Sequence, residues 1–447
     1  MRVGMDFGTT NSGIAVYDGH KINVLTLDPF SESEVVRSVI YLTRDHQVYV
    51  GDEAINLYNA QNINRERRMV RRKVGHIQME FSEIGKVETD VHIMIDEFEP
   101  GRLMRSLKSA LATPYNGTLI FGREYSLESL IALFLSTARE RAEKQLGKPI
   151  HAVTLGRPVH FVGAETPEDD QRAENRLREA AHRAGFEEVS FEYEPVAAAK
   201  HYALSVKNPQ RILVYDFGGG TLDLTVMSLH PGHAPEVLAI GGVGIAGDRF
   251  DQRLVEHALT PHFGRDVTWG DKDLPIPRTL IDQITVWEGL PTLATLETRA
   301  FLHRAQMGCS APVRLFALES LIFNFYGFAL FETVEQAKRR LSELPFTEIR
   351  FEGNEIDIWQ LVTRAQFEYY TRGEWRRIRE EVVETLNRAG LRTGDIDAVV
   401  RTGGSSSIPA SLEMLEELFG AEKLVEEDLF TGVTAGLGIT AWEHSAG

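Results

Sequence analysis

The chain has 447 residues, of which 43% are hydrophobic and 25% are charged, and its formal net charge is −17 at pH 7. This length exceeds one ordinary hydrophobic core, so we expect a globular protein of two or more domains. The negative charge argues against a nucleic-acid-binding protein, because neutralising phosphates requires a basic surface. The single cysteine, Cys309, excludes an internal disulfide framework and a cysteine-based zinc site.

The chain shows no pattern of a membrane anchor. No basic leader followed by an apolar stretch precedes the first predicted strand. The most apolar segment, residues 315–331, contains Glu319 and Asn324 and is shorter than the roughly 20 residues that a bilayer span needs. We therefore expect this segment to form a buried helix and the protein to be cytoplasmic, with no membrane partner.

The first half alternates between short apolar runs and helical segments, which is typical of an α/β fold. The predicted strands cover residues 2–5, 13–17, 20–27, 38–41, 47–50, 151–155 and 187–193. The predicted helices cover residues 101–111, 126–146, 170–184 and 196–202. Ser126 is the expected N-cap of the second of these helices, and Gly185 is the expected end of the third.

The second half continues the alternation and then changes in composition. The predicted strands cover residues 212–215, 224–227, 347–351, 355–358 and 398–401. Between residues 261 and 345, aromatic and leucine-rich faces predict long helices. Further helices are predicted over residues 249–259, up to about Ala389, and over residues 409–419 and 434–442.

Two glycine-containing segments, residues 5–12 and 215–223, repeat one design. Each places an aspartate, Asp6 or Asp216, at the end of an apolar run, followed by a glycine turn, threonine and a second apolar run. This order predicts a strand, a tight turn and a second strand. Glycines let backbone N–H groups approach an anion, and threonine hydroxyls add donors. The pair predicts two similar lobes that grip a nucleotide polyphosphate from both sides, with Mg²⁺ because the protein itself is acidic.

Three further segments occur with these hairpins in a fixed order: Glu194-Pro195 between the two hairpins, and residues 241–248 and Gly403-Gly404-Ser405 after the second. Together the five segments resemble the actin-like ATPase superfamily, and within it the ATPase domain of DnaK-type heat-shock chaperones. Residues 335–342 are similar to that family's nucleoside-binding helix. Gly156-Arg157-Pro158 resembles the YegD-like branch, which lacks a peptide-binding domain.

The resemblance implies an α/β fold, a two-lobed actin-like ATPase with duplicated ribonuclease-H-like lobes. Lobe I would cover residues 1–207, with an outer subdomain at about 38–124. Lobe II would cover residues 208–428, with an enlarged helical outer subdomain at about 246–371. Residues 429–447 would form a C-terminal helix that packs back toward lobe I.

The resemblance also implies roles for individual residues. Those expected to bind nucleotide are Gly8, Thr9, Thr10, Asn11, Gly218, Gly219, Gly220, Thr221, Gly247, Asp248, Glu335, Lys338, Arg339, Ser342, Gly403, Gly404 and Ser405. Asp6 and Asp216 would bind Mg²⁺ mostly through its water molecules, because Mg²⁺ dehydrates reluctantly. The expected catalytic residues are Asp216, Glu194, Arg71 and Thr221. Asp216 and Glu194 would orient or deprotonate the attacking water, and no covalent nucleophile is needed.

Several of these residues have a structural alternative. Glu335, Lys338 and Arg339 could form a solvated helix face. Glu194 could cap the helix that follows Pro195, and Asp223 could support its hairpin without touching a metal.

The sequence departs from the family pattern at three places. Arg71 stands where the chaperones carry a catalytic lysine, although a shift of two residues would bring Lys73 there, and the geometry of the two side chains differs. Ser407 replaces an adenine-stacking arginine, which would weaken nucleotide binding by about two- to thirtyfold. Phe430 replaces an acidic residue.

The function expected from this resemblance is Mg²⁺-dependent binding and slow hydrolysis of ATP by a chaperone-like protein whose lobes open and close with the nucleotide. A non-hydrolysing nucleotide sensor or scaffold is one alternative. A small-molecule kinase on the same fold is another, although no motif supplies its additional base, and a filament-forming protein is a third. A protein client or co-chaperone is unidentified, and no nucleic-acid partner is expected.

Overall fold

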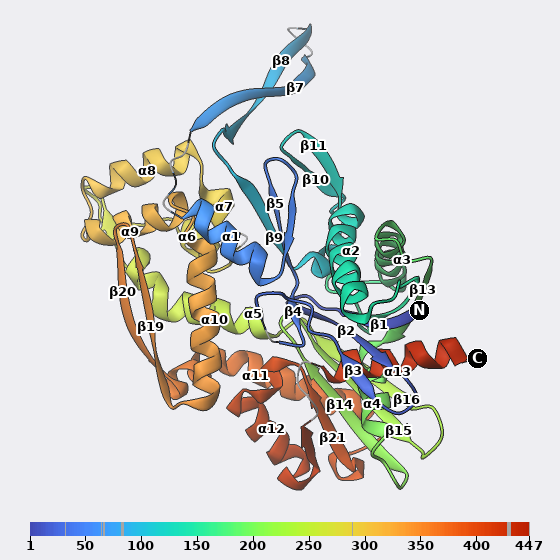
Figure 1. Ribbon diagram of the computed structural model, residues 1–447. Helices are drawn as coiled ribbons and strands as arrows, with labels where there is room; N and C mark the ends of the chain where they lie inside the picture. The colour runs from blue at the N-terminus through green and yellow to red at the C-terminus, as the bar shows by residue number, and fades with distance from the viewer. Residues whose placement is uncertain are drawn as a thin grey trace.

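Two mixed β-sheets with the same strand order form the framework of the protein. The computed structural model describes the chain except residues 32, 64, 66, 67, 82–84, 288, 427–430 and 447, and except the side chains of residues 69, 71–81, 85–95 and 446. The N-terminal sheet has the order β13-β12-β1-β2-β3, with β4 beside β2, and the C-terminal sheet has the order β16-β15-β14-β21-β22. Figure 1 shows the two sheets in separate halves, which we call lobe I and lobe II.

Pairing within the two sheets is also equivalent. The strands of lobe I are β1 (Arg2–Phe7), β2 (Asn11–Tyr17), β3 (Ile22–Val24), β4 (Val36–Arg37), β12 (Ala152–Arg157) and β13 (Glu188–Tyr193). Those of lobe II are β14 (Gln210–Phe217), β15 (Leu222–Leu229), β16 (Glu236–Val243), β21 (Ala398–Thr402) and β22 (Leu424–Glu426). In each lobe the first two strands form an antiparallel hairpin, and the first strand pairs in parallel with β12 or β21. The predicted duplication is therefore confirmed.

Helices cover the sheets and bury a separate hydrophobic core in each lobe. In lobe I, the helices α2 (Leu127–Leu146) and α3 (Pro167–Arg183) bury Leu130, Phe134 and Leu177 against the sheet. In lobe II, α11 (Arg364–Arg388) and α12 (Pro409–Phe419) join the core around β14 and β15.

Two small-residue helices occupy the space between the sheets. The helix α4 (Glu194–Ala203) and the C-terminal helix α13 (Gly432–Ala446) lie together, and α13 contacts β1 and β2 of lobe I. A Cβ atom added at Gly436 would lie 1.8 Å from the carbonyl oxygen of Ala197, and one at Gly4 would lie 2.1 Å from the carbonyl carbon of Leu437. Glycine is required for this close packing, which fixes the start of α4 beneath the cleft.

The outer part of lobe I differs from the predicted helix over residues 101–111. Instead, β9 (Gly101–Arg105) pairs with β5 (Val39–Thr43) in the three-stranded order β6-β5-β9, where β6 is Val48–Val50, and a short 3-10 turn, η1 (Leu107–Ala110), follows. The helical prediction was wrong because alternate residues of β9 are buried by this pairing, as at Leu103. The outer part also contains α1 (Asp52–Asn62) and the hairpins β7 (Met69–Phe81) with β8 (Gly85–Asp96) and β10 (Gly117–Ile120) with β11 (Arg123–Ser126).

The outer part of lobe II is helical, but most of its helices are short. They are α5 (Gly247–Leu254), α6 (Arg278–Gln283), α7 (Gly289–Leu293), α8 (Leu296–Gln306), α9 (Pro312–Phe323) and α10 (Gly327–Glu343). Two short pairs of strands complete it, β17 (Thr268–Trp269) with β18 (Leu274–Pro275) and β19 (Phe346–Gly353) with β20 (Ile356–Thr363). The prediction of long helices holds only for α10, because prolines such as Pro277 and Pro312 mark helix starts and interrupt the segment.

The apolar segment 315–331 is two helices rather than one. The helices α9 and α10 meet at an angle of 104°, and Phe325 between them has a left-handed backbone with φ of 61°. Among the described residues, no single helix is long and apolar enough to cross a membrane, and this bent pair passes only a test of combined length and composition. Leu315, Leu318 and Leu330 are fully buried in the core of lobe II.

Candidate functional site

A cavity of about 640 Å³ lies in the cleft between the two lobes. This volume is in the range of small-molecule and cofactor sites. Its walls come from both hairpin turns, from the start of α4, from α5 and α10, and from the turn after β21. The cavity therefore collects short segments that lie far apart in the sequence.

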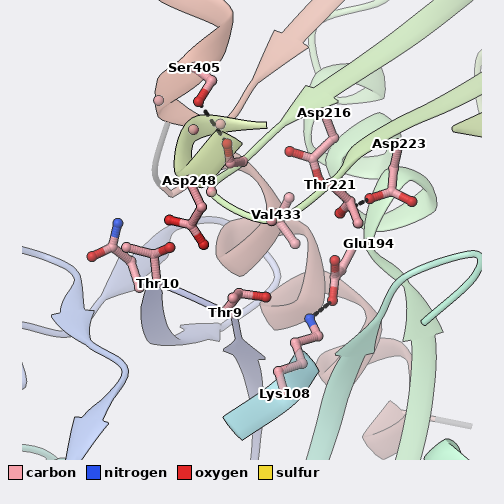
Figure 2. Close-up of a pocket in the computed structure, with 18 of the residues that line it drawn as sticks. Thr9, Thr10, Lys108, Glu194, Asp216, Thr221, Asp223, Asp248, Ser405 and Val433 are labelled. Carbon is pink, nitrogen blue, oxygen red and sulfur yellow. Dashed lines mark hydrogen bonds and ion pairs between the residues drawn. The ribbon is translucent and has the colours of Figure 1, made fainter. Parts of the chain in front are cut away.

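The two glycine turns face each other across this cavity. A Cβ atom added at Gly219 would lie 2.2 Å from the Thr10 hydroxyl of the opposite lobe, and one at Gly8 would lie 2.1 Å from the carbonyl oxygen of Asn11. Larger residues at either position would collide with neighbouring atoms, so glycine is required for the approach. Thr9 and Thr10 lie opposite Thr221 and Asp248 in Figure 2. Hydroxyls and backbone N–H groups are thus concentrated where an anion would be surrounded.

Acidic side chains gather behind the turns. Asp6 and Asp216 are the penultimate residues of β1 and β14, Asp223 is the second residue of β15, and Glu194 is the first residue of α4. Figure 2 shows Asp216, Asp223 and Glu194 on one side of the cavity, with Lys108 pointing to Glu194. The Lys108 ammonium donates a hydrogen bond to the Glu194 carboxylate, and both side chains are almost fully buried.

Burial of this cluster raises the pKa of its aspartates. Desolvation and the nearby Glu194 raise the pKa of Asp6 to about 7 and that of Asp216 to about 6. Desolvation and Asp216 raise the pKa of Asp223 to about 8, although the Thr221 hydroxyl donates a 2.7 Å hydrogen bond to its carboxylate. Burial lowers the pKa of Lys108, but attraction to Glu194 and Asp6 outweighs this and raises it above its ordinary value. The cluster is rich in negative charge that a cation would stabilise.

The donor atoms of the cluster fit a hard divalent cation. The acidic side chains of the cluster offer carboxylate oxygens as metal ligands. Such oxygens bind Mg²⁺ better than they bind a soft metal. Within the residues that the structure describes, no three acidic, histidine or cysteine side chains converge closely enough to hold a metal ion directly. Binding of Mg²⁺ by Asp6 and Asp216 through water molecules stays a prediction.

The other end of the cavity is lined by α10 and by the turn after β21. Glu335, Lys338, Arg339 and Ser342 lie on α10 and contribute to the wall. The Lys338 ammonium donates hydrogen bonds to the Asp251 carboxylate, at 2.8 Å, and to the Gly247 carbonyl oxygen, at 3.0 Å. It therefore ties α10 to α5, and the solvated-face alternative is excluded for Lys338, whose side chain is 11% exposed.

The turn after β21 also links segments around the cavity. The Ser405 hydroxyl donates a 2.7 Å hydrogen bond to the carbonyl oxygen of Gly218, which fixes this turn against the second glycine turn. The Ser407 hydroxyl donates to the carbonyl oxygen of Gly404 at 2.8 Å and also lines the cavity. Ser407 thus offers a small polar surface at this end.

Every predicted site residue whose side chain the structure describes lies in one cavity. The residues expected to bind nucleotide or metal all line it, as do the expected catalytic residues Asp216, Glu194 and Thr221. Arg71 and Lys73 lie in β7, and their side chains are outside the described residues, as is Phe430. Their roles stay predictions.

Sequence reasoning missed Lys108 and Asp251. Lys108 follows β9 in the 3-10 turn η1, in a segment wrongly predicted to be a helix. The sequence signal that could have identified Lys108 is a single lysine among the apolar residues Leu107, Ala110 and Leu111. A lysine that is buried in such surroundings requires an acidic partner. Asp251 belongs to an ordinary-looking helical pattern, so only the tertiary contact with Lys338 distinguishes it.

Comparisons with known proteins agree with this geometry. The family model described as Hsp70 protein matches residues 2–270 and 328–441. The chaperone protein DnaK of Thermotoga neapolitana is 26% identical over 97% of this chain, and that of Cyanidioschyzon merolae is 27% identical over 94% of it. The chain spans 58% of the length of each relative. Residues 271–327 fall outside the family match.

Proposed function

Because the chain belongs to the Hsp70 family, we propose that it is a cytoplasmic, chaperone-like ATPase that binds Mg²⁺-ATP between its lobes and hydrolyses it slowly. The observation that carries the proposal is the pair of glycine turns facing each other over a buried acidic cluster with one lysine. A polyphosphate in this position would contact both lobes at once. Its binding would favour the closed arrangement, and loss of a phosphate would weaken that preference.

Each wall of the cavity has a proposed task. The two glycine turns would bind the β- and γ-phosphates, with hydroxyl donors from Thr9, Thr10 and Thr221. The outer wall, Glu335, Lys338, Arg339 and Ser342 of α10, would hold the nucleoside from one side. Gly247, Asp248 and the turn Gly403–Ser405 would close the remaining sides. When bound, Mg²⁺ would neutralise charge on the phosphates.

The catalytic step would use the acidic cluster to position water. Asp216 would accept a hydrogen bond from the attacking water, and Glu194 would hold Lys108 in the cavity through their ion pair. In-line transfer of the phosphoryl group to water depends chiefly on such positioning and on stabilised charge. Thr221 would keep Asp223 oriented through its hydrogen bond.

We further propose Lys108, rather than Arg71, as the cation that stabilises the developing charge. Its ammonium is buried in the cavity beside Glu194 and influences the pKa of Asp6 and Asp216. A compact ammonium differs from a planar guanidinium in the geometry of its contacts, so Lys108→Arg should not restore full activity to this site.

The decisive measurement is phosphate release from Mg²⁺-ATP by purified protein, together with identification of the nucleotide that the protein retains. We expect Asp216→Asn and Lys108→Ala to lower the rate of hydrolysis by about 10²-fold or more, as for other charge-positioning groups. Asp271→Asn, at an exposed site in lobe II, is the matched control and should leave the rate unchanged.

Three outcomes would change or reject the proposal. Unchanged turnover in Asp216→Asn would remove its catalytic assignment. Tight ATP binding with no phosphate release over hours would favour the sensor or scaffold, and no nucleotide binding at all would reject the proposal.

A further inference from the structure

The segment outside the family match, residues 271–327, reaches across the cleft to lobe I. Its Trp287 packs against a cluster formed by lobe I residues Tyr41, Tyr58 and Leu103 together with Phe328 at the start of α10. The rings of Trp287 and Phe328 are edge-on with centroids 5.7 Å apart, and those of Phe328 and Tyr58 are edge-on at 5.8 Å. Phe328 is 1% exposed. These contacts join the outer parts of the two lobes by apolar packing.

Arg105 connects this cluster to the nucleotide cavity. Its guanidinium carbon lies 5.8 Å from the centroid of the Trp287 ring, and its Nη2 donates a 3.4 Å hydrogen bond to the carboxylate of Asp248. Asp248 lines the cavity from lobe II, whereas Arg105 ends β9 of lobe I. The Arg105 side chain is 17% exposed, so it is held between these partners with little access to water.

Other charged contacts cross the cleft nearby. Both terminal nitrogens of Arg37, in lobe I, bind the carboxylate of Glu332 on α10, and one of them lies 3.4 Å from Glu335. Glu335 also lines the cavity. The guanidinium carbon of Arg65 lies 4.1 Å from the ring centroid of Phe325, the residue that joins α9 to α10. The lobes are thus linked at points that share acidic side chains with the cavity.

We infer that Trp287, in the segment outside the family match, acts as a latch that holds Arg105 against Asp248 and thereby slows the escape of bound nucleotide. This inference rests on the proposed function of the same cavity. A nucleotide that contacts both lobes can leave only when they separate, and separation breaks the contacts of Arg105 with both Trp287 and Asp248. Arg105 is a positioning residue, because it acts on the nucleotide through Asp248.

The inference is tested by the dissociation rate of a fluorescently labelled ADP, measured by displacement with excess unlabelled ADP. Loss of one cation–π contact in Trp287→Ala should accelerate release by about 2- to 30-fold. Arg105→Gln should accelerate it by at least as much, because it removes both contacts, and Arg105→Lys should restore part of the slow release. The double variant should release nucleotide no faster than Arg105→Gln, because the two residues act in series.

Matched controls separate the latch from general loosening of the fold. Trp359→Ala removes a tryptophan that is 60% exposed on β20 of lobe II, away from the cleft. Arg299→Gln removes an arginine over Phe323, a contact made entirely within lobe II. Both control variants should retain the slow release of the unmodified protein. Single-turnover hydrolysis should keep its rate in Trp287→Ala, since the latch acts on release and not on chemistry.

The possible results distinguish a failure of the latch from a failure of the proposed nucleotide-binding function. If unmodified protein binds no nucleotide, the proposed function fails. If it binds nucleotide and both Trp287→Ala and Arg105→Gln release it at the original rate, the latch is refuted while the proposed function stands. Equal acceleration in the control variants would also refute it. Should Trp287→Ala fail to fold, the comparison of Arg105→Gln with Arg105→Lys decides the question.

Discussion

At the scale of single residues, the site is dominated by carboxylates that burial makes reluctant to ionise. The pKa values of Asp6, Asp216 and Asp223 are all raised, chiefly by desolvation and then by a neighbouring carboxylate. Lys108 compensates only part of this charge. Such a cluster costs stability at neutral pH when no ligand is present, and a bound cation would relieve that cost.

Ligand-free protein should therefore lose stability as the pH rises from about 4 to about 8. In the unfolded chain these carboxyls ionise near 3.8, whereas in the folded protein they keep their protons to about 6, 7 and 8. Between those values the unfolded state releases more protons, so rising pH favours unfolding. Thermal melting of ligand-free protein across this range measures the effect. The decline should be shallower in Asp223→Asn, and an equally steep decline there would contradict the assignment to Asp223.

At the scale of elements, the carboxylates of the acidic cluster lie near the ends of strands or at the start of a helix, whereas the opposite wall of the cavity comes from the second half of α10. The paired turns after β1 and β14 depend on glycine for different reasons: Gly8 lies against the Asn11 carbonyl oxygen of its own turn, and Gly219 lies against Thr10 of the opposite lobe. The sequence predicted these turns from local order alone. It did not predict that Gly219 faces Thr10, since that contact depends on how the two lobes are placed.

Gly219→Ala should sharply weaken nucleotide binding while the protein stays folded. The added Cβ would lie 2.2 Å from the Thr10 hydroxyl, so the Thr10 side chain must rotate away from its present position or one of the two turns must shift, and either change disturbs the donors around the cavity. Gly373→Ala is the matched control, because its Cβ would meet no atom within 4 Å in the interior of α11. That change should leave binding intact and stabilise the protein by roughly 0.5–1 kcal/mol. Equilibrium titration with labelled ADP measures binding, and thermal melting measures stability. Unaltered binding in Gly219→Ala would show that the two turns do not bind the ligand together.

At the scale of the whole molecule, the two lobes are held together by contacts on both sides of the cavity. The helices α4 and α13 pack between the sheets, and the Trp287 cluster with the Arg37 and Arg105 contacts joins the outer parts. We propose that the division near residues 207 and 208 marks the boundary between the moving parts. A ligand that bridges the lobes would then stabilise the molecule as a unit.

Mg²⁺-ADP should raise the melting temperature of the protein in proportion to the logarithm of its concentration. A ligand at about 100 times its dissociation constant stabilises the folded state by about 2.7 kcal/mol when it binds only that state. Removing Mg²⁺ with a chelator should reduce the shift, because the acidic cluster would then face the phosphates uncompensated. Differential scanning calorimetry provides the measurement. An identical shift with and without Mg²⁺ would argue that no divalent cation takes part.

The family, the duplicated α/β fold and most of the residues that line the cavity could be predicted from the sequence. These features depend on short stretches of sequence, such as an apolar strand that ends in Asp6 or Asp216 before a glycine turn. The residue preferences of strands and turns make such stretches recognisable. The resemblance to DnaK-type chaperones and the two-lobed fold are confirmed by the match to the Hsp70 family. The residue roles stay predictions, although the expected nucleotide- and metal-binding residues lie together in the cleft.

The burial of Lys108 in the cavity and the contacts across the mouth of the cleft follow from tertiary packing and could not be predicted from the sequence. Lys108 lies in a segment whose strand depends on pairing with β5, and that non-local pairing overrides the helical pattern read from the sequence. Trp287 and Arg105 are far apart in sequence and give no joint signal, so their contact arises only when the lobes pack. Local order encodes turns and strands, whereas the charge balance of the site and its closure depend on which distant surfaces fold against each other.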